Sequence, residues 1–191
     1  FIELFIPHKN ADDRGAKRWF TLSSSPTEED LPITTKIFPE RPSSFKMALY
    51  SLEPGILLNM ASPMGDFVLP KDTSIPLTFV AGGIGCTPFR SILKYIKDAQ
   101  EKRDISMLYA VGELEYAAFL KIFEDLGDNL KLLDTSVDGH LDSSKILKFS
   151  NNDSGFYYIS GQEPMVESIA SDLIKNGIGK SGLHGDFFPN Y

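Results

Sequence analysis

The sequence predicts a two-domain protein, with an antiparallel β domain over residues 1–71 and an α/β domain over residues 72–191. In the first part, short strand-like segments are separated by prolines, which long helices tolerate poorly. In the second part, continuous apolar runs alternate with segments that carry apolar side chains at helical spacing. Such strand–helix alternation implies a parallel sheet with helices on both faces.

Four short strands and one helix are expected in the first part. Its opening residues read FIELFI, a pattern typical of a strand. The helix is expected at Phe45–Ser51, where Ser43 or Ser44 supplies the N-cap. The four expected strands are Phe1–Ile6, Trp19–Ser23, Leu31–Phe38 and Ile56–Met60.

The second part begins with a buried strand at Leu77–Ala81, a glycine turn and a helix from Pro88. Thr87 is suited to cap this helix, and proline is suited to its first turn. The remaining expected strands are Ile105–Val111, Leu130–Asp134, Phe156–Ser160 and Ser181–Gly185. The remaining expected helices are Tyr116–Leu126, Ser143–Phe149 and Pro164–Asn176.

Composition excludes several classes of function. The net charge of −7 argues against nucleic acid as the main partner, because phosphate backbones bind basic faces. We expect no metal, because a lone Cys86 cannot build a zinc or iron–sulfur site and the three histidines lie far apart in sequence. A single cysteine also fits a reducing, cytoplasmic setting. No apolar run of about 18 residues is present, so we expect no membrane span and no signal peptide.

The sharpest local motif is the segment Val80–Pro88, which reads VAGGIGCTP and lies between a buried strand and a helix. Its three glycines allow a tight turn and a close approach of a ligand to the backbone. The helix N-terminus that follows suits a pyrophosphate. The alternative is a plain turn between strand and helix, for which one glycine suffices. Glycine spacing alone does not decide between the two interpretations.

Three other segments are ambiguous when each is taken alone. Arg18–Ser24 places an arginine before an aromatic strand, where a surface ion pair is the commoner role. Ile159–Met165 again has the order strand, glycine turn and helix, which also fits an ordinary connection. Gly185–Tyr191 carries aromatic residues that could simply pack a terminus onto the core.

Together these segments resemble the ferredoxin–NADP(+) reductase-like family of flavoprotein reductases. The resemblance covers nearly the whole chain, and its motifs occur in the family's order. The matching segments are Arg18–Thr21 for R-x-Y-S/T, Ser43–Lys46 with Leu49 for the pyrophosphate turn, Pro63–Phe67 for P-x-G-x-F, Gly82–Pro88 for G-G-x-G-x-T-P, Gly161–Met165 for G-P-x-x-M, and Asp186–Tyr191 for D-x-F-x-G-Y.

The resemblance implies an FAD site in a β-barrel domain over residues 1–71. Arg18 is expected to pair with the FAD pyrophosphate, Phe20 to lie against the isoalloxazine ring, and Thr21 to offer its hydroxyl near flavin N5. Ser43 and Ser44 would present donors to the pyrophosphate, and Phe188 or Tyr191 would cover the other flavin face. The full expected FAD set is Arg18, Trp19, Phe20, Thr21, Lys36, Ser43, Ser44, Phe188 and Tyr191.

The resemblance also implies a nicotinamide site in a Rossmann-like domain over residues 72–191. Thr87 would lie where flavin and nicotinamide meet, so Thr21 and Thr87 are the expected catalytic residues. The protein would position and tune the cofactors, which supply the chemistry. The full expected NAD(P)-binding set is Gly82, Gly83, Ile84, Gly85, Thr87, Pro88, Glu113, Gly161, Gln162 and Met165.

The sequence departs from the family pattern at several positions. Phe20 replaces tyrosine, and Pro42 stands where the pyrophosphate turn has glycine, which removes one N–H donor. Glu113 stands near the place of the cation that binds a 2′-phosphate, so NADH is favoured over NADPH. Cys86 either fills the turn or places a thiol near the nicotinamide. We also expect the flavin barrel to lack its first strands.

We therefore expect an FAD-dependent NAD(P)H oxidoreductase module that transfers a hydride between nicotinamide and flavin N5. Its electrons would be exchanged with an external carrier or a missing domain, because the chain holds no haem or iron–sulfur ligands. Two alternatives stay open. The chain is a redox-inactive nucleotide-binding module of a larger assembly, or it is the soluble tail of a membrane-bound reductase.

Overall fold

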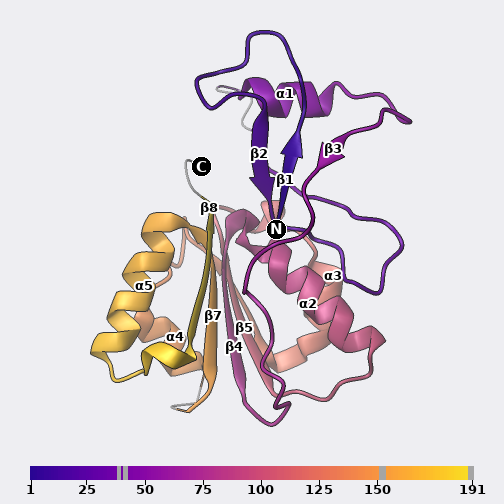
Figure 1. Cartoon of the computed structure of the whole chain (residues 1–191). Helices are drawn as coiled ribbons and strands as arrows, with labels where there is room; N and C mark the ends of the chain where they lie inside the picture. The colour runs from indigo at the N-terminus through magenta and orange to yellow at the C-terminus, as the bar shows by residue number, and fades with distance from the viewer. Residues whose placement is uncertain (38–39, 41–42, 151–153, 189–191) are drawn as a thin grey trace.

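The computed structural model describes residues 1–37, 40, 43–150 and 154–188, and these residues form two sheets (Figure 1). An antiparallel sheet of three strands has the order β2-β1-β3, and a parallel sheet of five strands has the order β6-β5-β4-β7-β8. The predicted antiparallel and parallel parts are therefore confirmed. The predicted barrel is not confirmed, because the described strands form no closed sheet.

The antiparallel sheet consists of β1 (Ile2–Phe5), β2 (Lys17–Phe20) and β3 (Asn59–Met60). Alternation along these strands places one row of apolar side chains against helix α1 (Ser44–Tyr50). Ser43 caps this helix, because its side chain accepts a hydrogen bond from the Lys46 N–H. The buried cluster consists of Ile2, Leu4, Ile6, Phe20 and Phe45.

Three of the expected strands in the first part need correction. The strand expected at Trp19–Ser23 is β2, which begins and ends earlier, at Lys17–Phe20. The described residues of the expected strand Leu31–Phe38 form a single bridge, between Ile33 and Leu22, because Pro32 lacks the N–H that a ladder needs. The strand expected at Ile56–Met60 shrinks to β3, because only its last two residues pair with β1.

The parallel sheet consists of β4 (Leu77–Gly82), β5 (Ile105–Val111), β6 (Leu130–Asp134), β7 (Phe156–Gln162) and β8 (Leu183–Phe188). Strands β5 and β6 lie on one side of β4, whereas β7, which comes later in the sequence, lies on its other side. The strand order therefore reverses between β4 and β7. Ligands of such sheets bind at the carboxyl ends of the strands near this reversal.

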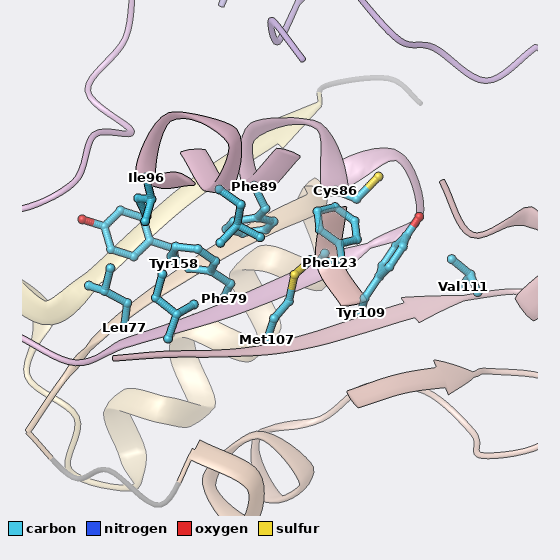
Figure 2. Close-up of a cluster of buried hydrophobic side chains, with 13 residues drawn as sticks. Leu77, Phe79, Cys86, Phe89, Ile96, Met107, Tyr109, Val111, Phe123 and Tyr158 are labelled. Carbon is cyan, nitrogen blue, oxygen red and sulfur yellow. The ribbon is translucent and has the colours of Figure 1, made fainter. Parts of the chain in front are cut away.

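Helices cover both faces of the parallel sheet, as predicted (Figure 1). Helices α2 (Thr87–Asp98) and α3 (Leu120–Phe123) lie on one face, whereas α4 (Ser143–Ser150) and α5 (Glu163–Lys175) lie on the other. Figure 2 shows the cluster under α2, where the rings of Phe79 and Phe89 stack at 4.8 Å and Tyr158 meets Phe79 edge-on. This core fixes the start of α2 above the end of β4.

Three details of the second part also need correction. The helix expected at Tyr116–Leu126 is broken into a 3-10 turn at Leu114–Tyr116, the single turn α3, and a second 3-10 segment at Glu124–Asn129. Phe119 adopts a left-handed conformation with φ 62°, which interrupts any continuous helix. The last strand begins at Leu183 rather than at Ser181. Thr87 is the first residue of α2 and not its cap.

Candidate functional site

A cleft of about 1160 Å³ lies between the antiparallel sheet and the part of the α/β domain formed by the start of α2 and by β8. One wall comes from β2 and the residues after it, and the other comes from the first turns of α2 and from β8. The volume exceeds the roughly 300–1,000 Å³ typical of small-molecule sites. The lining residues used below are Phe1, Arg14, Arg18, Trp19, Phe20, Thr21, Ser24, Ser43, Lys46, Pro88, Ser91 and Asp186.

Positive charge gathers at the α1 end of the cleft, where Arg14, Arg18 and Lys46 all line it. Burial, together with the neighbouring charge of Arg14, lowers the pKa of Lys46 to about 8. Its Nζ donates to the Lys36 carbonyl at 2.7 Å. Because the nearby charge of Arg14 contributes to the lowering, an anion bound beside the two side chains would stabilise the protonated form of Lys46.

Arg18 is held in place by its neighbours on the β1–β2 loop. Its Nη2 donates to Asp12 Oδ1 at 2.6 Å, and its Nη1 donates to the carbonyls of Arg14 and Gly15 at 2.9 and 3.0 Å. Although burial acts to raise it, hydrogen bonds from Arg14 and Arg18 lower the pKa of Asp12 to about 2. Asp12 is therefore ionised throughout the physiological pH range and neutralises part of the cationic cluster.

Thr21 meets Asp186 where the two walls of the cleft meet. Thr21 Oγ1 donates to Asp186 Oδ2 at 3.2 Å, and Ser160 Oγ donates to the same oxygen at 3.4 Å. Burial raises the pKa of Asp186, and the hydrogen bond from Thr21 only partly offsets that effect. The contact joins residues that are 165 positions apart, from the end of β2 and from β8. It brings the Thr21 hydroxyl and the Asp186 carboxylate together at a partly buried position beside the cleft.

The glycine turns after β4 and β7 pack against each other. A Cβ on Gly85 would lie 2.2 Å from the Ser160 carbonyl oxygen, and a Cβ on Gly82 would lie 2.4 Å from Met165 Sδ. A Cβ on Gly161 would lie 2.6 Å from Met165 Cε. Three of the predicted ligand glycines therefore have a packing role. Gly83 differs, because it has φ +55° and a Cβ there would meet nothing within 4 Å.

Gly85→Ala is expected to lower the free energy of unfolding by about 3 kcal/mol or more, because the Ser160 carbonyl is backbone and cannot move aside. Gly83→Ala is expected to cost only about 1–2 kcal/mol, the penalty for a side chain in the left-handed region. Urea denaturation followed by far-UV circular dichroism measures both losses. Equal losses in the two variants would contradict this division of roles.

Thr87 and Cys86 are both buried at the start of α2. The Thr87 side chain is 1% exposed, and its Oγ1 donates to the Ile84 carbonyl at 3.2 Å, whereas the next residue, Pro88, lines the cleft. Burial raises the pKa of Cys86 to about 11, so the thiol stays protonated near neutral pH. This favours the interpretation in which the cysteine fills the turn (Figure 2).

Comparison with known proteins agrees with this geometry. Residues 79–171 match the family of oxidoreductase NAD-binding domains. The chain is 22% identical to a flavohemoprotein of Oceanobacillus iheyensis over 187 residues, which cover 90% of this chain and 46% of that protein. Residues 79–171 therefore belong to that family of NAD-binding domains, and over most of its length the chain is similar to flavohemoproteins. It spans about half the length of the curated flavohemoproteins that it matches.

Two solved structures share the fold of this chain. Ferredoxin-NADP+ reductase from Plasmodium falciparum has a TM-score of 0.77 and 18% identity, over 98% of this chain and 81% of that one. Flavohemoglobin from Malassezia yamatoensis, solved with bound FAD and heme, has a TM-score of 0.71 and 19% identity, over 97% of this chain and 50% of that one. The neighbours have the two-part architecture that the sequence predicts.

The two described aromatic side chains predicted to contact FAD differ in how much of their surface is exposed in the cleft. Phe20 borders the cleft but is only 4% exposed, because its ring packs 5.9 Å from that of Phe45. Trp19 is 56% exposed in the cleft and lies 5.9 Å from the ring of Phe1. The open aromatic surface of the cleft is therefore that of Trp19 and Phe1.

Only some of the other residues predicted to bind FAD line the cleft. Ser43 lines the cleft, whereas the Ser44 hydroxyl lies 3.1 Å from His8 Nε2 and accepts from the Asp12 N–H at 3.1 Å. Lys36 Nζ lies 5.4 Å from the centre of the Tyr116 ring, beside the α/β part. Pro42 and Tyr191 lie outside the described residues, as does the side chain of Phe188.

The predicted nicotinamide residues occupy the carboxyl edge of the parallel sheet. Glu113 is exposed just after β5, and Gln162 is exposed at the end of β7. Met165 supplies the packing partner of Gly82 and Gly161, in the first turn of α5. Of the predicted residues, Gly82, Gly161 and Met165 are thus brought together by the packing of the two turns.

The sequence analysis gave no role to Arg14, Ser24, Lys46 or Asp186, although all four line the cleft. Lys46 and Asp186 did have a local signal, because both lie in segments that resemble family motifs, and Lys46 is also a cation in the first turn of a capped helix. Within the described ranges, no group of three or more metal-ligating side chains occurs. No helix there has the length and apolar character needed to cross a lipid bilayer.

Proposed function

We propose that this chain is an FAD-dependent NAD(P)H oxidoreductase module. FAD occupies the cleft, and NAD(P)H binds on the turns after β4 and β7. The observation that carries the proposal is the joining of three features along one cleft: a cationic end, an open aromatic surface, and a hydroxyl–carboxylate pair at the carboxyl edge of the parallel sheet. The described part of residues 1–71 is then a flavin domain of the barrel type, and residues 72–191 are the nucleotide domain.

The residues of the cleft fit FAD. Its pyrophosphate requires cations, which Arg14, Arg18 and Lys46 supply at one end. The Ser24 hydroxyl borders the cleft and is buried with no hydrogen-bond partner among the described residues. Such an orphaned polar group is costly unless a ligand satisfies it. The polar edge of a flavin ring offers suitable acceptors.

When bound, FAD supplies an N5 atom that accepts a hydride from C4 of the nicotinamide, which leaves as NAD(P)+. Thr21 would help to hold the flavin through its hydroxyl at the end of β2, and Asp186 would orient that hydroxyl by accepting its hydrogen bond. The Asp186 carboxylate stabilises positive charge that develops on the nicotinamide side of the cleft. Gly83, with open space around it, lets the dinucleotide approach the backbone at the start of α2.

The best-supported nicotinamide is NADH. Glu113 is exposed after β5, where a carboxylate suits a ribose 2′-hydroxyl and repels a 2′-phosphate. Glu113→Gln is expected to improve the ratio of kcat/KM for NADPH to that for NADH by about 5- to 100-fold, which corresponds to roughly 1–3 kcal/mol. Glu115→Gln is the matched control, because this carboxylate lies two residues further on and is also exposed. Equal shifts in both variants would refute the role of Glu113.

FAD binding is expected to weaken as pH rises above about 8. The reason is that Lys46 loses its proton there in the free protein, and the cleft then loses one positive charge. Fluorescence titration of FAD between about pH 6.5 and 9.5 measures the effect. Lys46→Arg should remove the pH dependence, because a guanidinium stays protonated. A dependence that survives in Lys46→Arg would assign it to another group.

The electrons are exchanged with a separate carrier or domain. Flavohemoproteins, of which the chain spans about half, combine flavin and haem by name. We therefore propose a haem or other one-electron centre as the class of partner, and a cytoplasmic setting in keeping with the single, protonated Cys86.

A visible spectrum tests the proposed function. The purified protein, loaded with FAD, is expected to absorb as a bound flavin and to bleach when NADH is added without oxygen. Far-UV circular dichroism confirms folding in the same sample. A folded chain that cannot retain FAD would refute the oxidoreductase and support a redox-inactive nucleotide-binding module. That second candidate rests on Phe20, which Phe45 largely covers, and on the engagement of Arg18 by Asp12.

A further inference from the structure

The two walls of the cleft are joined by an ion pair that lies outside its lining. Arg90, in the first turn of α2, donates through Nη2 to Glu28 Oε1 at 2.7 Å and through Nη1 to Glu28 Oε2. Nη1 also donates to the Ser23 carbonyl at 2.9 Å. The guanidinium thus forms a fork to the carboxylate and holds a backbone carbonyl as well, an arrangement that lysine cannot reproduce.

Two further contacts support the same junction. Ser91 Oγ donates to the Ser24 carbonyl at 2.5 Å, and Glu28 Oε2 accepts from the Ser25 N–H at 2.7 Å. The side chains of Arg90 and Glu28 are only 20% and 23% exposed, so solvent screens their attraction less than on an open surface. The segment Ser23–Glu28 is therefore attached to α2 through side chains and backbone together.

The junction lies close in sequence to both predicted catalytic residues, Thr21 and Thr87. Ser23 lies two residues after Thr21, and Arg90 lies three residues after Thr87. The junction therefore connects the backbone that presents the predicted flavin contact with the helix that begins at the nicotinamide turn. Neither Arg90 nor Glu28 lines the cleft, so neither is placed to touch a cofactor.

We propose that Arg90 and Glu28 are positioning residues that hold the flavin wall and the nicotinamide wall at the separation that hydride transfer requires. This role rests on the proposed function. Hydride transfer depends steeply on the distance between donor and acceptor atoms, and a misplacement of about 1 Å costs roughly 100-fold in rate. Loss of the junction therefore reduces the rate of the chemical step and leaves the pyrophosphate contacts of FAD unchanged.

The test compares Arg90→Ala, Arg90→Lys and Glu28→Gln in the FAD-loaded chain. In Arg90→Ala, anaerobic single-turnover reduction by NADH is expected to slow by about 10- to 100-fold, while the Kd for FAD changes less than about threefold. Arg90→Lys keeps the charge but loses the fork, so an intermediate rate is expected. Combining Arg90→Ala with Glu28→Gln should slow reduction no further, because both changes break the same junction.

A second measurement does not depend on activity. Hydrogen exchange at the backbone amides of Ser23–Glu28 is expected to be about 10-fold faster or more in Arg90→Ala and in Glu28→Gln. Lys97→Ala is the matched control, because it removes an ion pair of α2 with Asp125, away from the cleft. Unchanged exchange in both variants, or an unchanged reduction rate alongside faster exchange, would overturn the positioning role. If wild type is not reduced by NADH, the proposed function fails, and the exchange measurement still decides whether the junction exists.

Discussion

Arg18→Ala is expected to weaken FAD binding by about 10- to 100-fold, the largest effect on affinity that we expect from one substitution. A hydrogen bond to a charged group contributes about 1.5–3 kcal/mol, and each 1.4 kcal/mol is tenfold in Kd. Arg18 lies in the cationic end of the cleft, and its guanidinium is already oriented by Asp12 and two carbonyls. The Arg18 side chain therefore loses little conformational entropy when a pyrophosphate binds. Quenching of flavin fluorescence measures the change in Kd.

Arg18→Lys separates charge from geometry, because it keeps the cation and loses the fork. An affinity between those of wild type and alanine is expected. Lys175→Ala, which removes an exposed ion pair with Asp172 on α5, should leave the Kd unchanged. An unchanged Kd in a folded Arg18→Ala protein would mean that Asp12 retains Arg18 and that the pyrophosphate binds elsewhere.

The parallel sheet could be predicted because its information is local. Runs such as Ile105–Val111 are apolar on both faces, and only a strand covered by helices on both sides buries them fully. The start of α2 was predictable for the same reason, since Pro88 follows a glycine turn. The strand order itself was not predicted, and it is the pairing of β7 with β4 that places the two glycine turns side by side.

The errors arose where distant contacts outweigh local pattern. Leu31–Phe38 has strand-like residues, yet among those described only Ile33 forms a bridge. Gly85 was predicted as a ligand contact, and the sequence did not indicate its packing role, in which a Cβ would lie 2.2 Å from a backbone carbonyl oxygen of β7. The pairing of Arg90 with Glu28 spans 62 positions, and no local pattern indicates it. Such contacts depend on how segments distant in the sequence pack together, which single-residue propensities do not encode.

Asp186→Asn is expected to slow the reduction of FAD by NADH by about 10- to 100-fold. Departure of a hydride leaves positive charge on the nicotinamide, and a carboxylate in a sheltered site stabilises that charge more than it would in water. Asparagine preserves the size of the side chain and can still accept from Thr21 Oγ1, so the loss reports the missing charge. Anaerobic stopped-flow absorbance at saturating NADH measures the rate.

The pH dependence of reduction distinguishes this electrostatic role from a merely structural one. Burial raises the pKa of Asp186, and only the ionised carboxylate stabilises positive charge. The rate in wild type is therefore expected to rise as pH increases through that raised pKa and then to level off. Asp186→Asn should be slow and independent of pH over the same range. Thr21→Val, which removes the hydrogen bond that partly offsets burial, should shift the rise to higher pH as well as slow the reaction, because the carboxylate then loses a donor to its charged form.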